Sequence, residues 1–208
     1  MLFEASQSDC LFVSNDELWA FGTNNKGQLG LGHRNQVGSP TIVDERFDES
    51  GIKSIKCGFN VTLVLTNDGN VFTCGQVSRR ANSFKYMTLF DHVDLPFKTE
   101  IIDINDRTCY VFSGNELYFW DNVEDIIGYQ NPTKMNVDNI KNFYCTNFGS
   151  IIIINNNNEL LLSQYTYVDD NSFECFFKKI DTEFSPPIGF LSDTFGMPHI
   201  VNKCGQDI

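Results

Sequence analysis

Paired apolar runs separated by short polar turns recur four times along the chain. The pair Thr62–Thr66 and Val71–Gly75, for example, flanks the turn Asn67–Asn70. Asn, Asp and Gly tolerate the positive φ angles of tight turns, so each pair predicts an antiparallel β-hairpin. The four predicted hairpins cover residues 10–22, 62–75, 109–121 and 150–164.

The spacing of these hairpins predicts a repeat. Their second strands begin at Leu18, Val71, Leu117 and Leu160, which gives steps of 53, 46 and 43 residues. A period of roughly 40–50 residues built from short strands is typical of propeller blades or a related β array. Residues 190–202 resemble residues 143–155 and indicate the start of a fifth unit.

Each unit is expected to have four strands. Ile52–Cys57 alternates apolar and polar residues before the second hairpin, which suits a half-buried strand. Thr62–Thr66 is apolar at three successive positions, so we expect neighbouring units to cover both of its faces. The predicted outer strands are residues 40–43, 87–90, 132–135 and 175–180.

Helical periodicity is absent apart from one helical turn expected at Asp121–Tyr129. The chain is therefore predicted to be all-β, a partial or small β-propeller of about four to four and a half four-stranded blades. We expect a single repeat domain over residues 1–208. Its approximate repeats are 1–51, 52–100, 101–139 and 140–187, with a partial repeat at 188–208.

Composition limits the classes of partner. The 15 basic and 27 acidic residues give a formal net charge of −12, which disfavours direct binding to a phosphate backbone and leaves a basic protein partner open. No apolar run is long enough to span a membrane, and the N-terminus lacks the features of a secretory signal.

The seven cysteines lack metal or redox spacing, so reduced core thiols and a cytoplasmic or nuclear location are expected rather than disulfides.

A longer motif points to a family. Glu17–Gly32, followed by Pro40–Val43 and Lys56–Leu65, resembles the hallmark of the regulator of chromosome condensation repeat family. The later repeats keep the hairpins but lose the signature: Gly75 is retained, whereas Asp121 and Gln164 replace the glycine.

The resemblance implies a seven-bladed propeller, which needs roughly 350 residues at this period. The 208 residues here supply fewer blades, so the chain would form an open arc, close unusually, or be completed by another chain, for instance as a homo-dimer. An open arc would expose an apolar blade face at each end.

Several motifs suggest chemistry but fit structural roles better. The glycines of Gly27–Gly32 lack the order of a dinucleotide fingerprint and are expected to allow a tight excursion between strands. His33, His92 and His199 lack metal-ligand spacing, and Asp169–Asn171 lacks calcium-loop spacing. We therefore assign no catalytic, cofactor-binding or metal residue and expect no enzyme activity and no cofactor.

The predicted function is a non-catalytic protein–protein interaction module that binds through loops on a propeller-like scaffold. The alternative implied by the resemblance is a guanine-nucleotide exchange factor or regulator of a Ran-like small GTPase, although no segment matches the β-wedge of the founding member. A decayed paralogue that folds poorly is a third interpretation. The loops that differ most between repeats are 32–39, 76–85, 91–98, 121–131 and 165–173.

Overall fold

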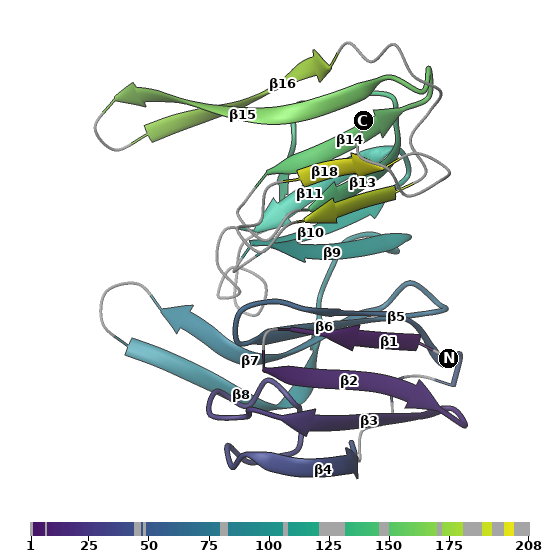
Figure 1. The fold of residues 1–208 in the computed structure, drawn as a ribbon, viewed down its shortest axis with the longest axis vertical. Helices are drawn as coiled ribbons and strands as arrows, with labels where there is room; N and C mark the ends of the chain where they lie inside the picture. Colours follow the sequence, from purple (N-terminus) through teal and green to yellow (C-terminus); the bar gives the residue numbers. More distant parts are fainter. Residues whose placement is uncertain are drawn as a thin grey trace. The chain divides into compact units, whose positions relative to one another are not determined.

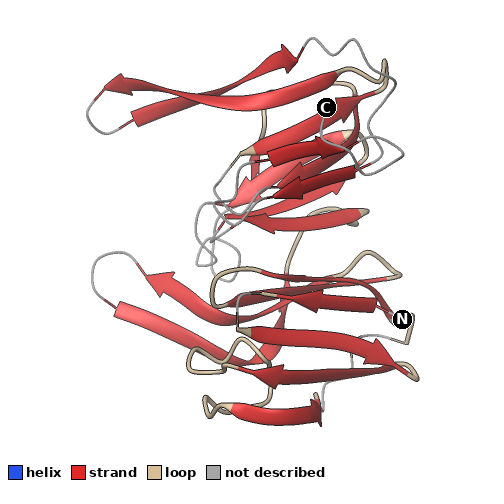
Figure 2. Cartoon of the chain, in the orientation of Figure 1, coloured by secondary structure: helices blue, strands red, loops and turns tan. Residues whose placement is uncertain are grey.

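The computed structural model describes residues 2–6, 8–43, 47, 49–79, 83–105, 108–120, 132–145, 150–169, 172–180, 189–192 and 198–201. Every regular element in this part of the chain is a β-strand (Figure 2). The all-β prediction is thereby confirmed. The helical turn predicted at Asp121–Tyr129 lies outside the described residues.

Four four-stranded antiparallel sheets follow one another along the described chain, each with its strands in sequence order (Figure 1). We call them blades 1 to 4. Blade 1 contains β1 (Leu2–Ala5), β2 (Asp9–Ser14), β3 (Glu17–Gly22) and β4 (Val37–Ile42). Blade 2 contains β5 (Ile52–Cys57), β6 (Val61–Thr66), β7 (Val71–Arg79) and β8 (Ser83–Val93). Blade 3 contains β9 (Ile101–Asn105), β10 (Thr108–Ser113), β11 (Glu116–Trp120) and β12 (Thr133–Lys134). Blade 4 contains β13 (Ile140–Cys145), β14 (Ile151–Asn155), β15 (Leu160–Asp169) and β16 (Ser172–Ile180), and a hairpin of β17 (Gly189–Ser192) and β18 (Pro198–Val201) follows.

The predicted outer strands all overlap observed ones, namely β4, β8, β12 and β16. Two predicted loops are wrong, however, because the ladders continue through them. β7 and β8 pair from Gln76 opposite Tyr86 to Arg79 opposite Ser83, and β15 and β16 pair as far as Asp169 opposite Ser172. Aromatic and β-branched residues in both segments favour the extended backbone. In Figure 1 both hairpins reach beyond the inner strands of their own blades.

The chain divides into two compact units. Unit 1 comprises residues 1–114 and 118–134, and therefore holds blades 1 and 2 and most of blade 3. Unit 2 comprises residues 115–117 and 135–208, and therefore holds blade 4 and the β17–β18 hairpin. In unit 2, Ile151–Ile153 of β14 are almost completely buried.

The core of unit 1 consists of two apolar clusters, one on each face of blade 2. The cluster shared by blades 1 and 2 is Leu11, Leu18, Ala20, Leu29, Val43, Phe47, Ile55, Val64, Cys74 and Phe90. The cluster shared by blades 2 and 3 is Val61, Leu63, Leu65, Val71, Met87, Val93, Ile102, Ile104, Cys109, Val111 and Trp120. All six residues of β6 are buried, which confirms that both faces of this strand are covered.

Candidate protein-binding surface

The loop that joins β3 to β4 carries the repeat signature and is tied to itself by a buried asparagine. Asn24 is fully buried; its side-chain Nδ2 donates to the His33 carbonyl at 2.8 Å, and its Oδ1 accepts from the Leu29 amide at 3.0 Å. The Lys26 amide donates to Gln28 Oε1 at 3.0 Å. The hydrogen bonds of Asn24 hold the two ends of the segment Asn24–His33 together, so the loop has one defined shape.

Two glycines allow this loop to approach blade 2. Gly27 and Gly30 have φ angles of +84° and +69°, which residues with a side chain rarely adopt. A Cβ at Gly27 would lie 2.8 Å from the Met87 carbonyl oxygen, and one at Gly30 would overlap the Phe90 ring. The glycines therefore permit a tight excursion, as the sequence predicts, and they also admit the neighbouring strand β8.

The same loop is anchored to blade 2 by hydrogen bonds. The Gln28 carbonyl accepts from Thr62 Oγ1 at 2.7 Å and from Cys74 Sγ at 3.3 Å, and the Gly32 amide donates to the Thr88 carbonyl at 2.7 Å. Leu29 is fully buried in the first apolar cluster. No sequence pattern indicates the role of Gln28, because every residue type has the backbone carbonyl that accepts these hydrogen bonds.

Beyond the anchored part, the loop is open to solvent. Gly32, His33, Arg34, Asn35 and Gln36 are all exposed, and we call residues 32–36 the loop tip. The tip lies within the predicted loop 32–39. Its base is held by the buried contacts of Asn24 and Gln28, so the tip is an exposed segment on a rigid support.

Two cations of the β3–β4 loop, one of them in the loop tip, lie at the same aromatic ring of β8. Lys26 Nζ lies 5.2 Å and Arg34 Cζ 4.7 Å from the centroid of the Tyr86 ring in β8. Lys26 Nζ also donates to the Tyr86 hydroxyl at 3.5 Å. Neither cation forms an ion pair with a carboxylate of the described residues.

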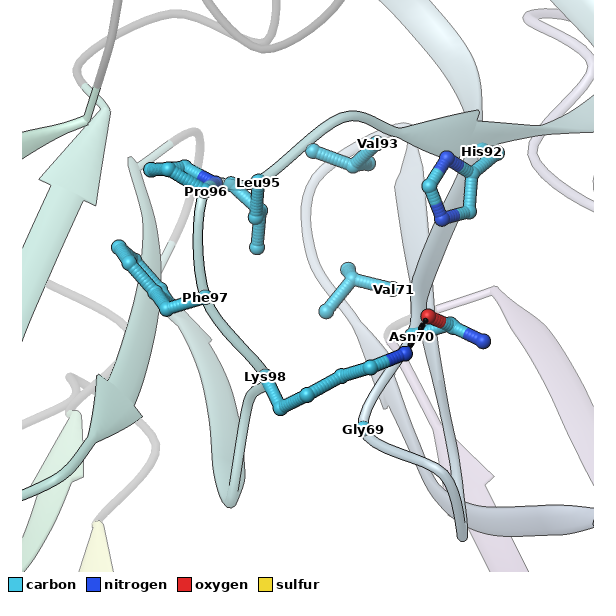
Figure 3. Close-up of a pocket in the computed structure, with 9 residues that line it drawn as sticks. All are labelled: Gly69, Asn70, Val71, His92, Val93, Leu95, Pro96, Phe97 and Lys98. Carbon is cyan, nitrogen blue, oxygen red and sulfur yellow. Dashed lines mark hydrogen bonds between the residues drawn. The ribbon is translucent and has the colours of Figure 1, made fainter.

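A second exposed feature is a small hollow at the junction between β8 and β9 (Figure 3). Its volume is about 220 Å³, and it is lined by Gly69, Asn70, Val71, His92, Val93, Leu95, Pro96, Phe97 and Lys98. Lys98 Nζ donates to Asn70 Oδ1 at 2.6 Å across its rim. Pockets for small ligands usually measure about 300–1,000 Å³, so this hollow suits a single side chain of a partner.

The walls of this hollow are fixed by the core. Phe97 stacks on Tyr118 of β11 with ring centroids 4.5 Å apart, and Val71 and Val93 belong to the second apolar cluster. The predicted loop 91–98 supplies most of the lining, because β8 ends at Val93 and irregular backbone follows. The predicted loop 121–131 lies outside the described residues.

Blade 1 presents an apolar row on the face opposite the first cluster. The strand register places Phe3 opposite Phe12, Phe12 opposite Trp19, and Trp19 opposite Ile42. The rings of Phe12 and Trp19 stack with an interplanar angle of 8°, whereas Phe3 and Ile42 are 61% and 43% exposed. We call these four residues the blade 1 row.

The inner strands β1, β5 and β9 lie side by side and carry opposite charges. Lys56 Nζ lies 3.4 Å from Asp103 Oδ1, so β5 and β9 are joined by an ion pair. Burial raises the pKa of Glu4, and the charge of Lys56 partly opposes that rise. On β2, burial raises the pKa of Asp9, while hydrogen bonds with Ser6 and Gln28 oppose it.

The three histidines belong to different elements of the chain. His33 lies in the loop tip and His92 at the end of β8, while His199 belongs to β18. Asp169 ends β15, and residues 170 and 171 lie outside the described part. In the described ranges no group of three or more His, Cys, Asp or Glu side chains is arranged to hold a metal ion. No helix among these residues has the length and apolarity needed to cross a membrane.

The five cysteines whose side chains are described are free thiols. Burial raises the pKa of Cys109 to about 12 and raises the pKa of Cys74 well above its usual value. These two thiols therefore stay protonated at neutral pH and pack as small apolar groups.

Four-stranded meanders whose faces pack on neighbouring meanders are propeller blades, so the fold defines a β-propeller-type repeat protein. Residues 15–65 match the family described as "Regulator of chromosome condensation (RCC1) repeat", and residues 52–79 match a second family with the same description. The chain belongs to the RCC1-repeat family.

A curated relative agrees with the family assignment, and two solved structures agree with the fold. The human X-linked retinitis pigmentosa GTPase regulator is 30% identical over 140 residues, which is 62% of this chain and 13% of that protein. The crystal structure of human WBSCR16 superposes with a TM-score of 0.71 at 16% identity, over 91% of this chain and 55% of that one. Prp20p from Saccharomyces cerevisiae gives 0.69 at 12% identity, over 97% of this chain and 54% of that one.

Proposed function

We propose that this chain is a non-catalytic protein–protein interaction module that binds through loops on its propeller-type blades, in the cytoplasm or nucleus. The observation that carries the proposal is the loop tip, residues 32–36, which is exposed although its base is anchored in blade 2. A loop that is already ordered loses little conformational entropy when a partner binds, so its contacts contribute fully to affinity.

The hollow at Phe97 supports the same proposal. It is too small for a typical cofactor, yet its walls are fixed and it opens to solvent beside exposed Lys98. A preformed hollow of this size can receive one apolar side chain of a protein partner, and anchor residues in such hollows dominate many interfaces.

The proposal is tested by affinity capture from an extract of the source cells, with quantitative mass spectrometry. The test variant replaces residues 33–36 with Gly-Ser-Gly-Ser, and the control replaces Asn15 and Asp16, the exposed hairpin turn of blade 1, with Gly. We expect at least one protein to be retained by the wild type and the control but lost by the loop-tip variant. Equal retention by all three would contradict a role for the loop tip, and no enrichment over empty resin would contradict the module itself.

The alternative function, exchange on or regulation of a Ran-like small GTPase, is supported by the names of similar proteins. One relative is called a GTPase regulator, and the structure of Prp20p was described together with its binding to Gsp1p and histones. The chain matches only 13% of that relative and 54% of the Prp20p chain. Because it spans only part of either protein, their activities need a direct test for this chain. Release of a fluorescent guanine nucleotide from a purified Ran-like GTPase, measured with and without this chain, tests the alternative.

We further propose that a second copy of the chain is one of the protein partners and covers the blade 1 row. Phe3 and Ile42 are large apolar side chains that stay exposed, and they flank a stacked Phe12–Trp19 pair. In unit 1 the faces of neighbouring blades bury this kind of row, as the two apolar clusters show. Exposed apolar rows of this kind mark interaction sites in many proteins.

A further inference from the structure

We propose that the site formed by Lys26, Arg34 and Tyr86 binds an acidic segment of a partner protein through its carboxylate side chains. The inference rests on the proposed function, because it names the chemistry of one partner of the same loop. It starts from a convergence of donors: an ammonium, a guanidinium and a phenol O–H meet at one ring, with both cations within 5.2 Å of its centroid. We call these three residues the cation–tyrosine site.

The two charges repel each other in the absence of a ligand. Their distances to the same centroid place them at most about 10 Å apart, which is within about one Debye length at 0.1 M salt. The attraction of each cation to the ring offsets part of this repulsion. An anion between the two cations would relieve the rest, so the site favours a negatively charged ligand.

No carboxylate of the described residues already neutralises the pair. The chain has 27 acidic and 15 basic residues, so a cation has many potential partners within the molecule. Lys56 and Lys179 do form ion pairs, with Asp103 and Glu159. Lys26 and Arg34 form none within the described ranges, and Arg34 is exposed and has no hydrogen-bond acceptor there. Its planar donor fork is therefore available for a carboxylate, which it can bind through two parallel hydrogen bonds.

The site is preorganised by contacts already described. Lys26 lies two residues after Asn24 and Arg34 directly follows His33, and a hydrogen bond joins Asn24 to the His33 carbonyl. The Gly32 amide is bonded to the carbonyl of Thr88, two residues after Tyr86. The loop and β8 are thus held together before a ligand arrives. Binding then costs little ordering of the backbone.

An apolar neighbour adds to the description of the ligand. Leu89 is 53% exposed, and its Cδ2 would lie 3.5 Å from a Cβ placed on Gly32. A peptide that reaches both features would carry an apolar side chain next to its acidic residues. The ligand that fits is therefore a short acidic segment with an interspersed Leu, Ile or Phe.

A nucleic acid is the weaker fit for the same cations. The net charge of −12 repels a long phosphate backbone, and two cations neutralise only two phosphates. A short acidic segment places a few charges close to the pair and keeps the rest of the partner away from the acidic surface.

The test is fluorescence anisotropy with a labelled twelve-residue peptide of Asp, Glu and two Leu, titrated with the intact chain at two salt concentrations. Saturable binding that weakens at high salt, and that falls at least tenfold in the Lys26→Gln/Arg34→Gln variant, is the expected result. Arg34→Lys keeps the charge but removes the donor fork, so we expect an intermediate loss. The matched control is Lys53→Gln/Lys178→Gln, which also removes two positive charges, at exposed Lys53 of β5 and exposed Lys178 of β16, and should bind within twofold of the wild type.

Circular dichroism and thermal unfolding establish that each variant is folded. An equal loss in the Lys53→Gln/Lys178→Gln variant would overturn the inference, because binding would then follow total charge. No loss in the Lys26→Gln/Arg34→Gln variant would overturn it as well, because the peptide would then bind elsewhere. The same holds if a peptide with Asn and Gln in place of Asp and Glu binds equally well. Tighter binding of a single-stranded oligonucleotide of equal charge, sensitive to the same variants, would also overturn it.

The outcome is separable from that of the proposed function. If the acidic peptide fails to bind while the loop-tip variant still loses a captured protein, the further inference is wrong and the interaction module stands. If capture shows no enrichment and the peptide does not bind, both proposals are wrong.

Discussion

Thr62 Oγ1 donates a hydrogen bond of 2.7 Å to the carbonyl oxygen of Gln28, which lies 34 residues earlier in the chain. Thr62 is on the second strand of blade 2 and Gln28 is in the signature loop of blade 1, so this bond joins two neighbouring blades. Both residues are almost completely buried. This hydrogen bond fixes the signature loop to blade 2, and we call it the Gln28–Thr62 clasp. The exposed loop tip is therefore held in place by a contact that is buried.

Thr62→Val is expected to destabilise the fold by about 1–2 kcal/mol, because it removes the hydroxyl and leaves the Gln28 carbonyl with only the weak thiol donor of Cys74. Urea unfolding followed by circular dichroism measures the loss. Thr41→Val is the control, since Thr41 is exposed and should change stability by less than about 0.5 kcal/mol. Equal effects at the two positions would contradict the clasp.

Gly30→Ala should cost about 2 kcal/mol or more, because the φ of +69° disfavours a side chain and the new methyl group would overlap the Phe90 ring. Gly38→Ala is the matched change, since nothing lies within 4 Å of a Cβ there. We expect Gly38→Ala to be neutral or slightly stabilising. Thermal unfolding of both variants decides the point, and a tolerated Gly30→Ala would show that the loop can move away from β8.

Labelling of thiols should report on the same clasp. Burial raises the pKa of Cys109 to about 12, so its thiol stays protonated at pH 8, and the residue is fully buried. We expect Cys74 and Cys109 to react with iodoacetamide only when the fold opens. Gly30→Ala should accelerate labelling of Cys74, which contacts Gln28, more than labelling of Cys109, which lies in the second cluster. Peptide mass spectrometry separates the two sites, and equal acceleration would indicate global rather than local opening.

Asp9 should make stability fall as the pH rises. Burial raises the pKa of Asp9 in the folded state above its unfolded value of 3.8, so its protonated form is favoured by folding. The stabilisation is fully present below pH 3.8 and is lost as the pH rises through the folded-state pKa.

Asp9→Asn removes this titration and keeps an oxygen that accepts from Ser6. Relative to the wild type, the variant should therefore gain stability between pH 3.5 and pH 7, measured as the difference in urea midpoint. A difference that stays constant over this range, or that shrinks as the pH rises, would contradict the sign assigned to Asp9.

Phe3→Ser/Ile42→Ser should weaken self-association if a second copy covers the blade 1 row. Mass by light scattering, on reduced protein at several concentrations, would then show a concentration-dependent dimer for the wild type and a monomer near 23.7 kDa for the variant. Leu89→Ser is the control, because it removes an exposed apolar side chain of blade 2. A wild-type monomer at all concentrations would rule out the second copy.

Local sequence was sufficient where local physics decides the outcome. The hairpin turns are one case: Asn15, Asp16 and Gly69 adopt the positive φ angles that their residue types favour. The burial of β6 on both faces is another, since three successive apolar residues allow no exposed face. The signature Glu17–Gly32 likewise indicates the family from neighbouring residues alone.

The sequence by itself determined the four-stranded repeat, the family and the need for glycine in the β3–β4 loop, because turn chemistry and apolar periodicity are properties of neighbouring residues. Only the tertiary structure showed that Gln28 is bonded to Thr62, that Lys26 and Arg34 share the ring of Tyr86, and that the segment 76–85 is mostly strand. Each of these depends on residues far apart in the chain or on the pairing of two strands. Such contacts are determined by the packing of one blade against another. The residue pattern of one segment does not specify which residues of the adjacent blade it will contact.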